Sequence, residues 1–428
     1  MVYHYNNLDT LNVTAIKNSS YHETGSVVNV ANLTAGRIVV ENGGYIKEVA
    51  LASTATNDTA AVVVNGYVGT VDSSAIAEES NKVTATGSGY VVHNGSDEAA
   101  SMGTATSVET AITTLSQLHE FRDRVNGGQD YTGLTVKLGA DLDLTGVVWT
   151  PIGNSNNPFS GTFDGQNHTI KGLTNAGYEA TADNATFTTS TSNSSGYAYG
   201  LFGIIGHKTN NTAAVTLKNL IFTEVNIDAP QSNMCGALVG ADVKAAKSTS
   251  GTINSNYTGD ITISNIRVSG SIKALDSVAG VVGKIYSKGA TNISNCSNSA
   301  DITILGTNQK KGAGILGFIS TAGSLTLTGC SNSGNISYAN SLVELENIAG
   351  IVIAMLTSSN HITVTGNTNT GTIQTIDRGA SIVFAMGYAV STASSLVVNN
   401  NTCSANDGYN CAYGLDGNGG SGSTYPNA

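Results

Sequence analysis

The chain has 428 residues, of which 11% are charged and 40% are hydrophobic, and its formal net charge is −11. The 19 lysines and arginines are thinly scattered, so no basic stripe follows a phosphate backbone or an anionic membrane. We therefore expect no nucleic-acid partner. We also expect no membrane insertion, because no apolar run approaches the roughly 18 residues that a membrane helix needs. With 50 glycines and only 4 prolines among many Val, Ile, Asn, Ser and Thr residues, the composition is typical of a β-rich protein.

The amino-terminal residues MVYHYNNLDT lack the charged and then apolar layout of a signal peptide. Five cysteines, an odd number, argue against a disulfide scaffold and leave the redox compartment open.

Residues 1–105 repeat with a period of about 23 residues. Tyr21, Tyr45, Tyr67 and Tyr90 are 24, 22 and 23 residues apart. The last three each follow a glycine and precede Ile or Val, in the patterns GGYI, NGYV and SGYVV. We predict a first β-solenoid or β-roll in which tyrosine stacks on tyrosine along one edge. Such a stripe is either a sugar-stacking platform or a packing ladder that seals a corner, and we favour the ladder.

Residues 106–128 separate this segment from a second repeat system. Leu115, Leu118, Phe121 and Val125 lie on one face of a helix, and Gly127 follows as a stop signal. We predict a short α-helix near residues 114–126 that caps the second solenoid and marks the domain boundary.

Asp141 and Asp143, in KLGADLDLTG, form the best carboxylate pair in the chain. Two residues apart on a strand, they project from one face about 6 to 7 Å apart, which suits an inverting glycosidase. Leu142 and Leu144 alternate with these acids, as a strand with one buried face also requires, and we favour that explanation.

Other catalytic or metal-binding patterns are weak. The seven histidines share no ligand spacing with Asp, Glu or Cys, so we predict no metal site and no cofactor. In GTFDGQNHT we place Asp164 and Gly165 in a turn, which makes His168 a surface residue at a strand start and not a base. We predict no catalytic residues.

Residues 129–400 contain seven related segments, spaced 30 to 47 residues apart: TIKGL, TLKNL, TISNI, NISNC, TLTGC, TVTGN and VVNNN. Their fourth position holds only Gly or Asn, the residues that enter the left-handed backbone region most easily: Gly172, Asn219, Asn265, Asn295, Gly329, Gly366 and Asn400. The pattern predicts one backbone corner per structural unit.

Two apolar columns accompany this corner. Two residues before it stand Ile170, Leu217, Ile263, Ile293, Leu327, Val364 and Val398, and about six residues after it stand Ile272, Ile302, Ile336 and Ile373. A third strand of small and aliphatic residues follows, as in GALVG and GILGFI. Three short strands per coil predict an all-β fold, a parallel β-helix whose coils stack at about 4.8 Å.

Stacking places Cys296 and Cys330 in register on neighbouring coils. They form either a disulfide or metal pair, or a ladder of small buried residues beside Ile266, and we favour the ladder. Asn265 and Asn295 predict a short amide ladder of the same structural kind.

Two insertions interrupt the second repeat system. Residues 174–199 form a polar, Thr- and Ser-rich loop that bears Tyr178, Tyr197 and Tyr199, and another insertion lies at residues 241–258. Insertions in solenoids often serve recognition, although surface loops also lengthen at little energetic cost. We predict that these three tyrosines are binding residues.

Residues 401–428 contain Cys403 and Cys411, eight residues apart around an Asp-Gly turn. We predict a hairpin-like cap whose thiols pair if the compartment is oxidising.

Residues 115–173, with the signature WTPIG…PFSGTFDGQNHTI, resemble the first segment of bacterial surface proteins with GLUG-type repeats, which are common in gut Bacteroidetes. The later GLFG, GALVG and GILGF units look like degenerate GLUG repeats, whereas GIVIAM lacks the second glycine. The resemblance covers about residues 108–390 and implies a right-handed β-helix, a cell-surface or adhesive setting and no defined catalytic residues. The Gly-Tyr segment before it resembles passenger repeats of autotransporter adhesins or a phage fibre shaft.

These observations predict an extracellular β-solenoid, on a cell surface or a phage virion, that binds a glycan or protein surface through its inserted loops without catalysis. Self-association into a trimer or a filament is compatible with such a fold. Two alternatives stay open: a β-helical polysaccharide lyase or hydrolase, and a structural fibre or decoration subunit of a phage.

Overall fold

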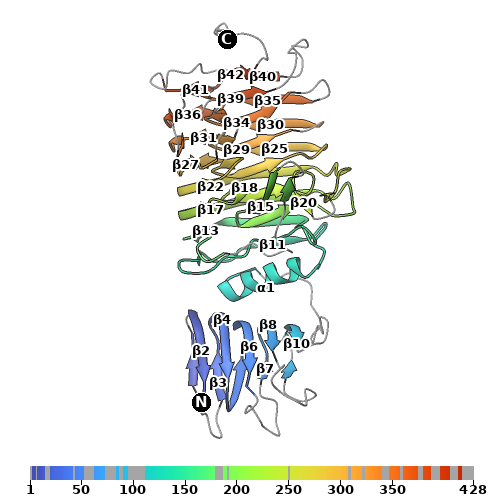
Figure 1. Cartoon of the computed structure of the whole chain (residues 1–428), viewed down its shortest axis with the longest axis vertical. Helices are drawn as coiled ribbons and strands as arrows, with labels where there is room; N and C mark the ends of the chain where they lie inside the picture. Colours follow the sequence, from blue (N-terminus) through green and yellow to red (C-terminus); the bar gives the residue numbers. More distant parts are fainter. Residues whose placement is uncertain are drawn as a thin grey trace. The chain divides into compact units, whose positions relative to one another are not determined.

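The computed structural model describes residues 2–5, 7–14, 20–41, 44–52, 62–72, 83–85, 90–94, 111–178, 187–189, 192–248, 251–306, 310–320, 323–339, 347–356, 360–374, 379–386, 396–404 and 413–416. Within these residues the chain consists mainly of β-strands, together with one α-helix, α1 (Leu115–Asn126). It divides into two compact units, Met1–Gly127 and Gly128–Ala428. Figure 1 shows stacked strands in both units.

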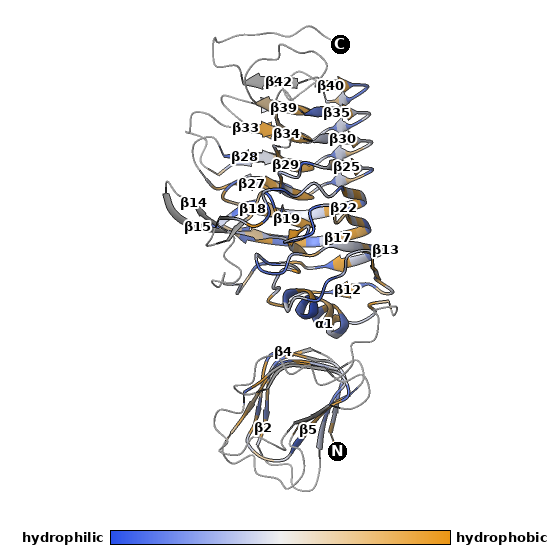
Figure 2. Cartoon of the chain, turned by 90° about the vertical axis from the view of Figure 1, so that its right-hand side faces the viewer, coloured by the Kyte–Doolittle hydropathy of each residue, from blue (hydrophilic) through white to orange (hydrophobic). Residues whose placement is uncertain are grey.

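The first unit is a roll of two five-stranded parallel sheets, and successive strands alternate between them. One sheet contains β1 (Val2–His4), β3 (Ser20–Glu23), β5 (Arg37–Val40), β7 (Val62–Val64) and β9 (Val83–Ala85). The other contains β2 (Asn7–Val13), β4 (Ser26–Leu33), β6 (Tyr45–Leu51), β8 (Tyr67–Asp72) and β10 (Tyr90–Asn94). Figure 2 shows the two sheets curving around a shared interior.

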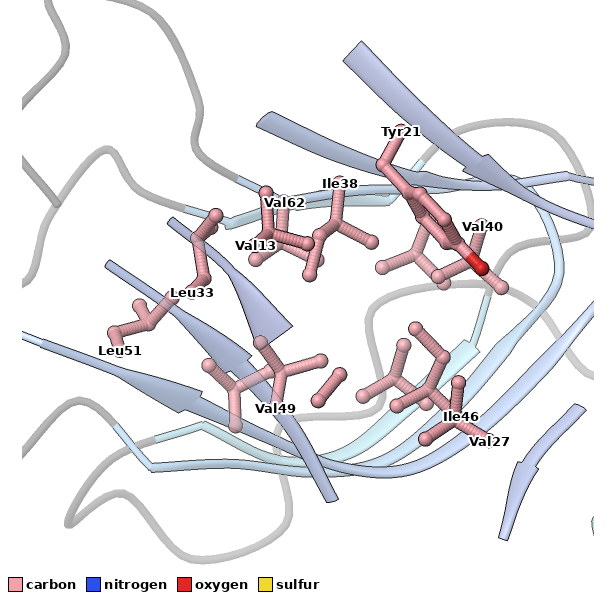
Figure 3. Packing of buried hydrophobic residues seen from close by; sticks show 14 residues of the cluster. Val13, Tyr21, Val27, Leu33, Ile38, Val40, Ile46, Val49, Leu51 and Val62 are labelled. Atoms are coloured by element: carbon pink, nitrogen blue, oxygen red, sulfur yellow. The ribbon is translucent and has the colours of Figure 1, made fainter. Parts of the chain in front are cut away.

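Aliphatic side chains from both sheets fill this interior. Val27, Ile38, Ile46 and Val62 are fully buried, and Figure 3 shows them converging from opposite walls. β-Branched residues suit this position because their stiff side chains pack well on a pleated surface. Within the described residues the first unit is therefore a β-roll, and the boundary at residue 105 stays a prediction.

The tyrosine column is confirmed for three of its four members. Tyr45, Tyr67 and Tyr90 are paired in register on β6, β8 and β10. Tyr21 instead lies on β3, in the other sheet, where it pairs with Ile38 and joins the core. The prediction for Tyr21 was wrong because each coil visits two sheets, so a spacing near 23 does not specify which sheet a residue enters.

Helix α1 has the predicted boundaries. Its first turn is a capping box, in which the Thr114 side chain accepts a hydrogen bond from the Gln117 N–H at 3.2 Å and the Gln117 side chain accepts one from the Thr114 N–H at 3.2 Å. The helix ends at Gly127, whose N–H donates to the carbonyl of Asp123.

Within the first unit, α1 packs against β6 and β8. Arg122 Nη2 donates to the hydroxyl of Tyr45 at 3.0 Å, and the His119 ring meets the Tyr45 ring edge-on with centroids 4.5 Å apart. Tyr45 is fully buried. The helix thus belongs structurally to the first unit, and its predicted role as a cap of the second solenoid stays a prediction.

The second unit is a parallel solenoid with three main sheets (Figure 2). The largest sheet contains β11 (Thr135–Lys137), β12 (Leu142–Asp143), β13 (Gly161–Lys171), β17 (Val215–Ala229), β22 (Ile261–Ala274), β25 (Ala290–Ser294), β26 (Ser297–Asn298), β27 (Asp301–Ile304), β30 (Ser324–Thr328), β31 (Ser331–Asn332), β32 (Ile336–Tyr338), β35 (His361–Thr365), β36 (Thr368–Asn369), β37 (Ile373–Gln374), β40 (Leu396–Asn399) and β41 (Thr402–Cys403). The second contains β14 (Phe187–Thr189), β15 (Ser192–Tyr199), β18 (Ser232–Gly236), β23 (Val278–Ala279), β28 (Lys311–Ala313), β33 (Asn347–Ala349) and β38 (Gly379–Ala380). The third contains β16 (Phe202–Ile205), β19 (Val239–Asp242), β24 (Val282–Ile285), β29 (Leu316–Ile319), β34 (Val352–Met355), β39 (Val383–Met386) and β42 (Tyr413–Asp416).

This arrangement confirms the predicted parallel β-helix. The second apolar column pairs in register from coil to coil, from Ile272 through Ile302 and Ile336 to Ile373, and these side chains are at most 5% exposed. The insertion at residues 241–258 holds a short antiparallel hairpin, β20 (Lys247–Ser248) and β21 (Gly251–Thr252). The handedness of the coil stays a prediction.

The corner column has the predicted backbone. All seven residues have positive φ, between 53° and 70°: Gly172, Asn219, Asn265, Asn295, Gly329, Gly366 and Asn400. In the left-handed region glycine has no Cβ to clash and asparagine tolerates the strain best, so the residue types follow from the geometry.

The first repeat segment, TIKGL, was nevertheless aligned with the wrong bend of its coil. Leu217 pairs with Phe163 and not with Ile170, so the first corner lies just after Asp164. There Gln166 and Asn167 have positive φ within β13, where the pairing register shifts between Asp164 and His168. The turn predicted at Asp164 and Gly165 is thus a bulge inside a strand. Ile170 pairs with Phe222, so the positive φ of Gly172 belongs to a second bend of the coil.

Polar and sulfur ladders follow the corner. Cys296 and Cys330 are free thiols, each 1% exposed, which confirms the ladder of small buried residues and excludes a disulfide between them. The Cys296 N–H lies 3.4 Å from Cys330 Sγ, and the Cys330 N–H donates to Asn367 Oδ1 at 2.8 Å. The amide ladder predicted for Asn265 and Asn295 stays a prediction for that pair, while Asn265 Nδ2 donates to Asn219 Oδ1 on the preceding coil at 2.8 Å.

A second amide ladder, which is buried, lies two residues after the Cys296 position of each coil. Asn298 Nδ2 donates to Asn332 Oδ1 at 2.8 Å, and Asn332 Nδ2 donates to Asn369 Oδ1 at 2.9 Å. All three side chains are at most 1% exposed. Each amide donates to the next one, so the ladder satisfies polar groups that burial would otherwise leave without partners.

The described part of the carboxyl-terminal segment continues the solenoid. Strand β41 pairs with β36 and strand β42 pairs with β39, both in parallel. These two strands lie in different sheets, and the hairpin-like cap predicted around the Asp-Gly turn falls on residues 405–412, which lie outside the described residues. Cys403 is disulfide-bonded, whereas Cys411 lies outside the described residues.

Candidate functional site

The three tyrosines predicted as binding residues come together at the base of the first insertion. Tyr197 and Tyr199 lie two residues apart on β15, and Tyr178 follows β13 in a turn closed by its N–H and the carbonyl of Asn175. The ring of Tyr178 lies 5.3 Å from that of Tyr197 and 5.2 Å from that of Tyr199, measured between centroids. The spacing of these tyrosines along the chain does not predict the contact, because the contact depends on how the insertion folds back.

The members of this tyrosine cluster differ in burial. Tyr199 is fully buried, and its hydroxyl lies 2.7 Å from the carbonyl oxygen of Thr174 and 3.1 Å from that of Trp149. Tyr197 is 5% exposed, and Tyr178 is half-buried. Tyr197 and Tyr199 therefore mainly support the cluster, and Tyr178 has the more accessible ring.

Burial also keeps these hydroxyls protonated. Desolvation raises the pKa of Tyr197 to about 12, and it raises the pKa of Tyr178 and of Tyr199 as well. All three phenols are thus hydrogen-bond donors at physiological pH.

A polar clamp fixes the turn that carries Tyr178. Asn175 Nδ2 donates to the carbonyl of Asp228 on β17 at 2.7 Å, and the Asp228 N–H donates to Asn175 Oδ1 at 2.7 Å. Asn175 is 9% exposed. Residues 179–186 and 190–191 of the insertion lie outside the described residues.

The carboxylates considered for glycosidase chemistry point to solvent from a surface strand. The side chains of Asp141 and Asp143 are 71% and 58% exposed, and Leu142 between them is buried. Asp141 Oδ1 accepts from the Thr169 N–H at 2.8 Å and lies 3.1 Å from Nδ1 of His168.

Hydrogen bonds hold the pKa of both carboxyl groups below the usual range. The main donor to Asp141 is the Thr169 N–H, and the main donor to Asp143 is Thr145. An inverting glycosidase needs one carboxyl group that keeps its proton, which usually means a raised pKa. Neither Asp141 nor Asp143 meets this requirement.

A cluster of lysines and aromatic rings on the second unit was not anticipated from the sequence. Lys284 Nζ lies 5.1 Å from the ring centroid of Tyr286 and 5.6 Å from that of Phe318. Lys311 Nζ lies 4.9 Å from the Phe318 ring, and Lys244 Nζ lies 5.9 Å from the Tyr286 ring. Burial lowers the pKa of all three lysines, so an approaching anion would stabilise their charge.

The repeat itself contains the sequence feature that could have predicted this cluster. Lys284 and Phe318 occupy equivalent positions of GVVGKI and GILGFI, and they pair in register between β24 and β29. Substitution of an aromatic residue by a lysine at one coil position marks a change of chemistry along an otherwise apolar column.

Within the described residues, no group of three or more His, Cys, Asp or Glu side chains is arranged to hold a metal ion. In the same part of the chain, no helix has both the length and the apolar character needed to cross a membrane.

Comparison with known proteins gives little further information. No protein family matches the sequence, and no curated protein matches it either. The fold is similar to the crystal structure of a putative immunoglobulin A1 protease from Bacteroides ovatus, with 18% sequence identity and a TM-score of 0.41, over 70% of this chain and 81% of that chain. The resemblance to GLUG repeats stays a hypothesis.

Proposed function

We propose that the second unit is a non-catalytic, glycan-binding β-solenoid that acts outside a cell, on a cell surface or on a virion. The observation that carries this proposal is the tyrosine cluster of Tyr178, Tyr197 and Tyr199, at the base of a polar insertion. Tyrosine combines an apolar ring, which packs on the C–H face of a sugar, with a hydroxyl that hydrogen-bonds to it.

The geometry supports a binding role for this surface more than a catalytic one. The clamp between Asn175 and Asp228 holds Tyr178 in place before a ligand arrives, which lowers the entropy cost of binding.

The test is direct binding of the full chain to a panel of neutral and acidic glycans. Tyr178→Ala should weaken binding of the recognised glycan at least about tenfold, because ring stacking is lost. Tyr178→Phe keeps the ring and should bind nearly as well as the unchanged chain. Val397→Ala, which alters another exposed apolar side chain on β40, is the matched control.

Equal affinities for the Ala and Phe variants would remove Tyr178 from the site. If no glycan on the panel binds, the remaining candidate for the second unit is a structural fibre or decoration subunit.

A further inference from the structure

Ser20, His22 and Glu41 form a continuous hydrogen-bonded chain on the first unit. The Ser20 Oγ lies 2.7 Å from His22 Nε2, and His22 Nδ1 lies 2.5 Å from Glu41 Oε1. Ser20 and His22 belong to β3, and Glu41 directly follows β5 on the next coil. A hydroxyl, an imidazole and a carboxylate in this order have the geometry of a nucleophile, a base and an orienting acid.

The contacts select the tautomer that such a relay needs. The Nδ1–H of His22 donates a hydrogen bond to the Glu41 carboxylate, which leaves the Nε2 lone pair to accept the hydrogen bond of the Ser20 hydroxyl. Glu41 is fixed in turn by Asn65 Nδ2, 3.4 Å from Oε2. The Tyr3 ring stacks on the His22 ring with centroids 4.4 Å apart, so the imidazole is held from its face as well as from both nitrogens.

The three groups differ in their exposure to solvent. The His22 side chain is 10% exposed and the Glu41 side chain 29%, while Ser20 is half-buried and accessible. On the neighbouring strand Arg37 pairs with Ser20 in register, so both side chains leave the sheet on the same face. An arginine on the face that carries the nucleophile can stabilise the negative charge that develops on a carbonyl oxygen under attack.

An exposed aromatic surface adjoins this relay. Tyr3 and Tyr5 are 48% and 72% exposed, and their rings are stacked with centroids 6.5 Å apart. Because Tyr3 also stacks on His22, the aromatic surface continues directly to the base. Exposed tyrosine rings in a row suit the apolar face of a sugar.

We propose that Ser20 and His22 are the nucleophile and general base of an esterase that removes acyl groups from sugar hydroxyls, with Glu41 as a positioning residue. The Ser20 oxygen attacks the ester carbonyl while its proton passes to His22 Nε2. The C–O bond to the sugar breaks, and the sugar oxygen takes that proton and leaves as a free hydroxyl.

Water completes the reaction. It gives one proton to His22 and attacks the acyl-Ser20 carbonyl, after which Ser20 regains its proton and a carboxylic acid is released. The sum is ester plus water giving alcohol plus acid, with no other reactant. This site lies in the first unit and does not depend on the glycan-binding role proposed for the second.

The experiment measures p-nitrophenyl acetate hydrolysis and labelling by a fluorophosphonate probe with the full chain. We expect slow turnover and a label that maps to the peptide containing Ser20. Ser20→Ala should abolish both, and His22→Gln should lower turnover at least about 100-fold. Thr10→Ala, which removes an exposed hydroxyl bonded to Asp9 on β2, should leave both unchanged.

Two further variants separate positioning and substrate binding from folding. Glu41→Gln should lower kcat, and Glu41→Asp should restore part of it, with KM unchanged in both. Tyr5→Ala should raise KM for an O-acetylated hexose and leave p-nitrophenyl acetate hydrolysis unchanged, because the Tyr5 ring extends the aromatic surface beyond Tyr3 and has no role in the chemical step.

Turnover that survives Ser20→Ala would overturn the proposal, and so would absence of both turnover and label in the unchanged chain. Circular dichroism and thermal melting of each variant must match the unchanged chain, so that a loss of activity is not a loss of fold. If Ser20→Ala melts at a lower temperature than the unchanged chain, Ser20→Cys replaces it. This substitution keeps the size of the side chain and should also lose fluorophosphonate labelling.

Discussion

The two units stack parallel coils in the same way, but they satisfy the polar groups at their bends differently. In the first unit the buried carboxylate of Glu23 accepts hydrogen bonds from the Gly25 N–H at 2.8 Å and from the Tyr21 hydroxyl at 3.0 Å, and it contacts His4. In the second unit, neutral asparagines such as Asn298 and Asn332 bond to one another from coil to coil.

The difference follows from the chemistry of the two side chains. A carboxamide both donates and accepts, so identical residues can stack on every coil, whereas a carboxylate only accepts and needs a new donor each time. Desolvation raises the pKa of Glu23, which shows that burying this charge has a cost that the amide ladder avoids. An amide ladder can therefore run through many coils, while each carboxylate bend is built individually.

The largest expected effect tests the amide ladder itself. Asn332→Ala removes bonds to Asn298, Asn369 and the carbonyl of Gly334 inside the solenoid, and it should destabilise the second unit by about 3 to 5 kcal/mol. Asn332→Asp keeps the size but loses the donor, so it should be at least as destabilising. Chemical denaturation measures the change, with Ser331→Ala as control; a loss below about 1 kcal/mol for either variant would contradict the ladder argument.

Asp242 is a charged position within the second unit, and it should make stability depend on pH. It is fully buried; Oδ1 accepts from the N–H groups of Ala245 and Tyr286, and Oδ2 has no partner in the described part of the chain. Desolvation raises the pKa of Asp242 to about 6. The folded state thus holds the proton more tightly than the unfolded state, and stability should fall as pH rises from about 4 through about 6.

Asp242→Asn removes this titration. We expect it to stabilise the protein at pH 8 by roughly 1 to 3 kcal/mol and to change little at pH 4. Urea unfolding at both pH values measures the difference. The same ΔΔG at pH 4 and pH 8 would show that folding does not raise the pKa of Asp242.

The corner column gives the next effect. Gly329 has a φ of 63°, and a Cβ there would lie 2.7 Å from Oδ1 of Asn295, which is a movable side-chain atom. Gly329→Val places a β-branched residue at positive φ and should cost about 1 to 3 kcal/mol, whereas Gly329→Asn should be nearly silent. Melting temperatures compare the two variants, and equal values would refute the role of the corner in selecting residues.

The smallest expected effect concerns the exposed acids. Asp141→Asn and Asp143→Asn should leave glycan binding unchanged, because both carboxylates are exposed to solvent on a strand whose other face is buried. A polysaccharide panel read by reducing-end release provides the second measurement. Turnover that disappears with Asp141→Asn would restore the alternative of a carbohydrate-active enzyme.

Local chemistry explains what the sequence revealed about the fold. Positive φ selects Gly or Asn one residue at a time, so the corner at Asn265 or Gly366 can be recognised without knowledge of its neighbours. The capping box of α1 is equally local, and its boundaries were predicted to within one residue.

Features that depend on loop length could not be predicted in the same way. Tyr21 was assigned to the wrong sheet, and TIKGL was aligned with the wrong bend, because a repeat period does not say which strand pairs with which. The contact of His22 with Glu41, 19 residues away on the next coil, has the same origin. Candidate sites of this protein therefore arise where two coils bring unlike residues together.

Because the corner recurs once per coil, the second unit can change in length only by whole coils. Asn295 and Gly329 are 34 residues apart, and every strand between them pairs with its counterpart one coil later. Duplication of that whole interval would add one rung and leave every earlier pairing intact, whereas insertion of a single residue within a strand would turn its apolar side chains to solvent. The gene can thus lengthen by recombination in steps of one coil, and each step would move surface sites such as the tyrosine cluster further from the end of the stack by one strand spacing, about 4.8 Å.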